Sequence, residues 1–198
     1  MVRILLILSL LLNITLIYIL KDKIAENLPH KSDVVLLGNS LTKSGDWNDL
    51  LKVDVQNSGM PGLNTSQYFP KLASKVLRYQ PSVCLIEGGI NDILQGIPPE
   101  RTFVNLKAIA DTLNSLGIEP VLQSVLYTSD TIKNKQADSI NVLLSNYSKL
   151  NSFKYIDLNK TPLVSNHILK NFYTVDGIHL TPPAYAIWAG EINKLFPK

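Results

Sequence analysis

A serine, an aspartate and a histidine occur at positions that suit nucleophilic catalysis. Ser40 lies in Gly38-Asn-Ser-Leu-Thr42 after an apolar run, and Asp176 and His179 are three positions apart in Asp176-Gly-Ile-His-Leu-Thr181. Serine catalysis needs a hydroxyl, a base that takes its proton, and a carboxylate that holds the base in one tautomer. A carboxylate and an imidazole at i and i+3 can meet across one turn of chain. By itself, however, a D-x-x-H pattern is a weak signal.

Two further segments lie between these, each after a strand-like run. Asn57-Ser-Gly-Met-Pro-Gly62 follows residues 53–56, and Gly88-Gly-Ile-Asn-Asp92 follows residues 83–86. With these segments the sequence resembles the SGNH hydrolase family, the GDSL-type esterases and acylhydrolases, and in particular its lysophospholipase-like branch. That family is named for a serine, a glycine, an asparagine and a histidine in four separate blocks. The resemblance extends from about Asp33 to the C-terminus, with all four blocks in the family's order.

The resemblance implies a role for each matching residue. Ser40 would be the nucleophile, His179 the general base and Asp176 the partner of that base. The backbone N–H groups of Ser40 and Gly62 and the side-chain amide of Asn91 would form the oxyanion hole. Each fixed donor aimed at the tetrahedral intermediate stabilises it by roughly 3–4 kcal/mol. A glycine suits the middle position because no Cβ then separates the backbone from the substrate.

The chain departs from the family signature at one position. Asn39 stands where the GDSL signature has an aspartate. That residue is not part of the family's triad, so the resemblance still implies the same mechanism. An amide can hydrogen-bond the neighbouring loops as a neutral donor and acceptor. The substitution changes the local electrostatics beside Ser40.

Each candidate also has an ordinary structural interpretation. Ser40 and Asn91 could cap helices, and Gly62 could serve a turn. His179 could be a polar loop residue, which is our interpretation of the other two histidines, His30 and His167, because neither has an acid at a matched spacing. The ordinary interpretations do not require four blocks to converge on one edge of a sheet, so their joint occurrence favours catalysis.

Composition excludes several other classes of protein. The chain has 198 residues, of which 45% are hydrophobic, enough for one domain with a full core. The formal net charge of +3 is too small and too scattered for a nucleic-acid surface. A single cysteine allows no disulfide within the chain. Neither a metal-ligand spacing nor a phosphate-binding loop occurs, so we expect chemistry without a cofactor.

The N-terminus carries a second kind of signal. Residues 4–20 are mostly apolar, follow Arg3 and precede Lys21-Asp-Lys23. A helix of that length spans about 26 Å, at the short end of what crosses a bilayer. A cleaved signal peptide is the competing interpretation, but no small-x-small cleavage site follows Leu20. We therefore expect residues 1–21 to be a transmembrane or signal-anchor helix, with the catalytic domain outside the cytoplasm; secretion after cleavage is the alternative.

The elements that must position these blocks alternate between strand and helix. Residues 22–32 read as a linker, and residues 33–198 as the SGNH hydrolase domain. Strand-like runs occur at 34–37, 53–55, 83–86, 120–125 and 155–157, and helical periodicities at 68–77, 103–113, 140–147 and 185–195. Such alternation predicts an α/β fold in three layers, with a parallel sheet between helices. Five strands suit the flavodoxin-like order 2-1-3-4-5, which the family resemblance also implies.

The function expected from these patterns is a serine esterase or acylhydrolase that cleaves carboxylic esters. The substrate could be an acetylated glycan, a lysophospholipid or another short acyl ester. Two alternatives stay open: an O-acyltransferase that uses the same acyl-enzyme, and a catalytically inactive, membrane-tethered binding module. The sequence leaves the oligomeric state undetermined.

Overall fold

Apolar runs form the central strands of a parallel sheet. The computed structural model describes residues 31–197, and in it all five residues of the first strand are buried. β-Branched and aliphatic side chains favour such strands, which are covered on both faces. The strands pair in parallel in the order β2-β1-β3-β4-β5, which confirms the predicted topology. Their bounds are β1 Val34–Gly38, β2 Val55–Gly59, β3 Val83–Ile86, β4 Glu119–Gln123 and β5 Lys154–Ile156.

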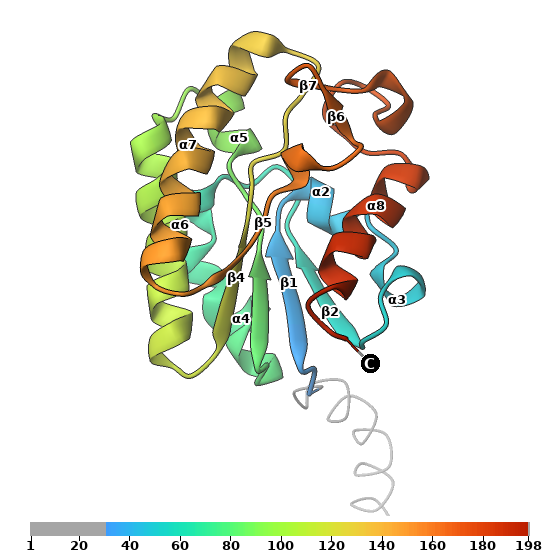
Figure 1. Cartoon of the computed structure of the whole chain (residues 1–198). Coiled ribbons are helices and arrows are strands. Elements are labelled where there is room, and N and C mark those ends of the chain that lie inside the picture. The colour runs from blue at the N-terminus through green and yellow to red at the C-terminus, as the bar shows by residue number, and fades with distance from the viewer. Residues whose placement is uncertain (1–30, 198) are drawn as a thin grey trace, which may run out of the picture. The chain divides into compact units, whose positions relative to one another are not determined.

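Helices cover both faces of this sheet. Figure 1 shows α6 (Pro99–Ser115) and α7 (Thr131–Leu150) on one side, and α8 (Pro182–Asn193) with the short α3 (Trp47–Leu50) on the other. This division follows from right-handed crossovers between parallel strands. Trp188 of α8 packs edge-on against Trp47 of α3, with ring centroids 5.0 Å apart, and its indole N–H donates to the side chain of Gln123 at 2.7 Å. The predicted three-layer α/β/α class is therefore correct.

The edge strand β2 differs from its prediction. The sequence indicated residues 53–55, but the strand begins at Val55, opposite Val34, and continues to Gly59. Its later residues are polar, and their side chains bond to the backbone of neighbouring segments: Asn57 donates to Lys43 O at 3.0 Å, and Ser58 donates to Lys75 O at 2.5 Å. Hydrophobic periodicity therefore ended before the strand did.

The segment predicted as one helix over residues 68–77 is a series of short turns. It consists of η1 (Thr65–Gln67), η2 (Phe69–Lys71), α4 (Leu72–Lys75) and η3 (Leu77–Tyr79). Pro70 has no N–H for a continuous helical ladder, and Val76 leaves the helical region at φ −129°. Tyr68, Leu72 and Val76 are buried as the periodicity indicated, whereas Phe69 and Ala73 are exposed.

The remaining elements lie around the carboxyl ends of the strands. They are α2 (Ser40–Lys43), α5 (Ile90–Leu94), η4 (Leu158–Lys160), η5 (Asn171–Tyr173) and a small antiparallel hairpin of β6 (Val164–Ser165) and β7 (Ile168–Leu169). The sequence analysis did not predict this hairpin. No helix within residues 31–197 is long and apolar enough to cross a membrane, and the predicted anchor at residues 4–20 lies outside the described part of the chain.

Candidate active site

The first block places a free hydroxyl at the carboxyl end of β1. The strand ends at Gly38, and α2 begins at Ser40. Asn39 is the N-cap of α2: its side-chain oxygen accepts the N–H of Leu41 at 2.7 Å. Because Asn39 supplies the cap, the ordinary interpretation of Ser40 as a capping residue does not hold. The Ser40 hydroxyl is therefore available for another hydrogen-bond partner.

That partner is the histidine of the fourth block. Ser40 Oγ lies 3.0 Å from His179 Nε2, and His179 Nδ1 lies 2.6 Å from Asp176 Oδ2. The side chains of His179 and Asp176 are 44% and 49% exposed. Ser40 and His179 are 139 positions apart in the sequence, and the structure brings them together with Asp176 in one hydrogen-bonded chain. This geometry suits proton transfer from the serine to the imidazole.

Backbone hydrogen bonds hold the acid and the base in register. Asp176 Oδ1 accepts the N–H of Ile178 at 2.9 Å and that of His179 at 2.7 Å. The His179 side chain, followed by its backbone N–H, lowers the pKa of Asp176 to about 2. Gly177 between them has φ +90°, and a Cβ there would lie 3.1 Å from Ser129. Ser129 in turn donates its N–H to Gly177 O at 2.9 Å, which ties this loop to the segment after β4.

The proposed oxyanion-hole residues lie beside one another. Gly62 has φ +77°, with open space where a Cβ would stand. The next carbonyl along, that of Leu63, accepts from Asn91 Nδ2 at 2.9 Å. Met60 donates its N–H to Gly38 O at 2.8 Å, so this loop also adjoins the serine block. One N–H of the Asn91 amide is engaged with Leu63, which leaves its second N–H for a ligand.

A buried carboxyl beside Ser40 was missed by the sequence analysis. Asn39 was expected to bond neighbouring loops, and its side-chain nitrogen donates to Glu87 Oε1 at 2.7 Å. Glu87 ends the apolar run of β3 and is 4% exposed. An acid at the end of a buried strand was the available signal, but the sequence did not show which residue would face it.

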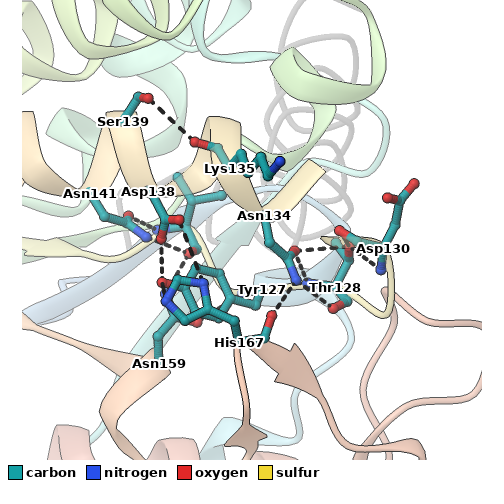
Figure 2. A network of polar contacts seen from close by, with 11 residues as sticks. Tyr127, Thr128, Asp130, Asn134, Lys135, Asp138, Ser139, Asn141, Asn159 and His167 are labelled. Carbon is teal, nitrogen blue, oxygen red and sulfur yellow. Dashed lines mark hydrogen bonds and ion pairs between the residues drawn. The ribbon is translucent and has the colours of Figure 1, made fainter. Parts of the chain in front are cut away.

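His167 lies in the turn between β6 and β7, in agreement with its interpretation as a polar loop residue. It has no acid at a matched spacing in the sequence, but Asp138 lies 3.6 Å from its Nδ1, and its ring stacks on Tyr127 with centroids 4.7 Å apart. Figure 2 shows these side chains converging, with Tyr127 also bonded to Asp138. The acid lies in α7, 29 positions before the histidine, so local spacing did not reveal it. His30 lies outside the described residues.

Within residues 31–197, no group of three or more histidine, cysteine, aspartate or glutamate side chains could hold a metal ion.

Comparisons with known proteins give consistent matches. A family model described as GDSL-like Lipase/Acylhydrolase matches residues 25–187. An Escherichia coli N-acylneuraminate cytidylyltransferase is 22% identical over 175 residues, covering 83% of this chain and 40% of that protein. An Escherichia coli protein named thioesterase 1/protease 1/lysophospholipase L1 is 28% identical over 107 residues, 51% of each chain. The chain thus spans about half, or less, of the length of these relatives.

Two solved structures have the same fold. A GDSL-like lipase from Bacteroides thetaiotaomicron has a TM-score of 0.74 and 24% identity, covering 82% of this chain and 86% of that one. A lipase/acylhydrolase from Enterococcus faecalis has a TM-score of 0.70 and 21% identity, covering 83% and 94%. At these identities the likeness extends to the fold alone.

Proposed function

Because the chain belongs to the GDSL-like lipase/acylhydrolase family, we propose that it is a serine hydrolase of carboxylic esters with Ser40 as its nucleophile. The observation that carries this proposal is the hydrogen-bonded chain from Ser40 through His179 to Asp176. A merely structural serine has no need of an imidazole whose far nitrogen meets a carboxylate.

The mechanism follows from the order of these contacts. Ser40 Oγ attacks the ester carbonyl carbon as its proton passes to His179 Nε2, 3.0 Å away. Asp176, 2.6 Å from Nδ1, stabilises the imidazolium and keeps Nε2 as the acceptor before reaction. The imidazolium then protonates the leaving alcohol. A water molecule, activated by the same base, attacks the acyl-enzyme and releases the acid.

Charge on the carbonyl oxygen requires donors at the same edge of the sheet. The N–H groups of Ser40 and Gly62 and the free N–H of Asn91 are the candidates. The bond from Asn91 to Leu63 fixes the amide beside the Gly62 loop before substrate arrives. Such preorganised donors stabilise the transition state without reorganisation at the moment of reaction.

The exposure of the site leaves room for a large leaving alcohol. His179 and Asp176 are nearly half exposed, so the side from which the leaving alcohol is protonated is open to solvent. We propose esters of large alcohols as substrates, with acetylated glycans, lysophospholipids and other short acyl esters as the candidates. We also propose that residues 4–20 anchor the protein in a membrane, because they form an apolar segment of about the length that crosses a bilayer. By resemblance to signal anchors, we propose that the catalytic domain lies outside the cytoplasm.

A covalent probe tests the nucleophile directly. A fluorophosphonate should label the wild-type protein once, on the peptide that contains Ser40, and Ser40→Ala should not be labelled. Ser44→Ala is the matched control, since Ser44 is exposed at the end of the same short helix, and it should label normally. Hydrolysis of a panel of acyl esters by the wild type, with Ser40→Ala as the blank, then defines the acyl chain. Labelling without release of acid would indicate a transferase, and no labelling would refute the proposal.

A further inference from the structure

Glu87 is a buried carboxyl group that the proposed mechanism does not use. It lies directly after β3, is 4% exposed, and accepts three hydrogen bonds. Asn39 donates its backbone N–H to Oε2 at 3.1 Å and its side-chain N–H to Oε1 at 2.7 Å, while Thr42 Oγ1 donates to Oε2 at 2.9 Å. All three donors come from the serine block.

These bonds fix the amide of Asn39 in one orientation. Its nitrogen donates to Glu87, and its oxygen accepts from Leu41 N at 2.7 Å. Exchanging the two amide atoms would put a donor against Leu41 N–H and an acceptor against the carboxylate. Ser40 lies between Asn39 and Leu41 in the chain, so its backbone is held from both sides.

The glycine before Asn39 is part of the same arrangement. A Cβ on Gly38 would overlap Thr42 Oγ1 and lie 2.5 Å from Glu87 Oε2. Only a residue without a side chain lets the strand end approach the carboxylate this closely. This geometry thus needs a glycine at position 38 and a donor amide at position 39, directly before Ser40.

No positive charge accompanies Glu87 among the described residues. The titratable groups that raise its pKa or respond to its charge are Asp92 of α5, Tyr68 before η2 and Tyr185 of α8. Lys43, the charged residue of α2, is exposed. Burial raises the pKa of Glu87 to about 7, against the opposing effect of the three donors.

We propose that Glu87 and Asn39 form a complementary pair that positions Ser40, in which position 87 carries the carboxylate that the GDSL signature has at position 39. An aspartate at position 39 would face Glu87 across the 2.7 Å contact, and two buried carboxylates at that distance cannot both ionise. The asparagine is therefore the residue that Glu87 requires. This inference rests on the proposed function of Ser40.

Protonation of Glu87 would disturb the pair. A carboxylic acid must donate its proton, and the two Asn39 N–H groups that face its oxygens can only donate, so the Thr42 hydroxyl would have to reverse its own bond to accept it. To accept from it, Asn39 would have to turn its amide and give up the cap of α2. Protonation of Glu87 then lowers activity on the acid side of the pH profile through its effect on the Asn39 amide.

A reciprocal exchange tests the pair. Asn39→Asp and Glu87→Gln alone should each lower kcat/KM by about 10–100-fold. The first substitution places two carboxyl groups against each other, and the second places two amide N–H donors against each other. In the double variant the new amide can donate to the new carboxylate while its oxygen accepts from the backbone N–H of residue 39 and from Thr42. Its kcat/KM should return to within about fivefold of wild type, far from the product of the single effects.

The pH profile separates positioning from general stability. Below the optimum, log kcat/KM should fall more steeply with decreasing pH in the wild type than in Glu87→Gln, since one required deprotonation is gone. Thr42→Val, which removes one donor to Glu87, should lower kcat/KM several-fold. Thr161→Val is its control: Thr161 is also buried and hydroxyl-bonded, but to Leu158 O after β5, and its loss should leave kcat/KM unchanged.

Three outcomes decide the matter. Recovery in the double variant, with the change of slope, supports the pair. If the losses in kcat/KM multiply in the double variant while the wild type shows Ser40-dependent hydrolysis, the inference is overturned and the proposed function stands. If the wild type shows no Ser40-dependent hydrolysis, the proposed function fails. The pair is then judged by thermal unfolding of the same four proteins, where additive shifts in Tm would overturn it.

Discussion

Replacing Asp176 by asparagine isolates the contribution of one carboxylate to the base. The amide can keep the two backbone bonds, because its oxygen can still accept from Ile178 N and His179 N. Its nitrogen would then face His179 Nδ1, where it donates and so favours the tautomer with a proton on Nε2. That tautomer cannot accept the proton of Ser40.

The expected magnitude follows from the exposure of the pair. In a buried triad this exchange lowers kcat about 10⁴-fold. Here the two side chains are 49% and 44% exposed, so water screens the interaction and lets the imidazole exchange tautomers more readily. We therefore expect a loss of about 10²–10³-fold in kcat/KM.

The dependence on pH gives a second check. The pKa of Asp176 is lowered to about 2, so its stabilising interaction is fully present above its ordinary pKa and is lost only as the pH falls towards 2. The ratio of wild-type to variant activity should then not change through titration of Asp176 between about pH 5 and 9. The assay is hydrolysis of 4-nitrophenyl acetate across that range.

Asp130→Asn is the matched control for this experiment. Asp130 accepts the N–H groups of the residues two and three positions on, and pairs with the Lys133 side chain three positions on, just as Asp176 does with its own neighbours. The same chemical change there should leave kcat/KM within a factor of two. If Asp176→Asn also stays within about threefold of wild type, another group orients His179 and the triad argument is wrong.

Three other predictions concern the remaining site residues and the N-terminus. Ser40→Ala and His179→Ala should each lower kcat by about 10⁴-fold or more, and the double variant should be little worse, because the two act as a unit; strictly multiplicative losses would refute the assignment. Asn91→Ala should lower kcat by about 10²–10³-fold with KM within a few-fold, whereas a raised KM at constant kcat would make Asn91 a ground-state contact. Removal of residues 1–30 should leave a folded, soluble and active domain, while the full chain should resist carbonate extraction from membranes. The deletion ends before Ser32 because the N–H of Ser32 donates to Tyr79 O at 3.1 Å and its buried hydroxyl donates to Val34 O. A mature protein that begins well after Leu20 and is free in solution would show a cleaved signal peptide instead.

The sequence predicted those features that repeat along the chain or lie close together in it. The apolar run at Val34 and the i, i+3 spacing of Asp176 and His179 are local patterns, and both were interpreted correctly as a strand and a contact. Parallel strands bring their carboxyl ends to one edge, so Ser40, Gly62 and Asn91, which follow β1, β2 and β3, could be expected at the same edge.

Features that depend on contacts between distant polar residues were not predicted. Glu87 lies 48 positions from Asn39, and neither residue alone indicates the other. The end of β2 was missed because Asn57 and Ser58 satisfy strand geometry through bonds to backbone carbonyls, which no hydrophobic pattern records. The partner of His167 was missed for the same reason, since only folding brings α7 to the hairpin.

The loop that carries Asp176 and His179 closes on itself. Val175 N donates to His179 O at 2.9 Å, and the Thr174 hydroxyl donates to the same carbonyl at 2.8 Å while accepting Gly177 N–H at 2.9 Å. The acid and the base therefore travel together whenever the loop moves, and their mutual contact survives the displacement. What a shift of the loop interrupts is the link from His179 to Ser40. In the proposed mechanism, the contact between Ser40 and His179 is therefore the one that depends on how this loop lies against the sheet.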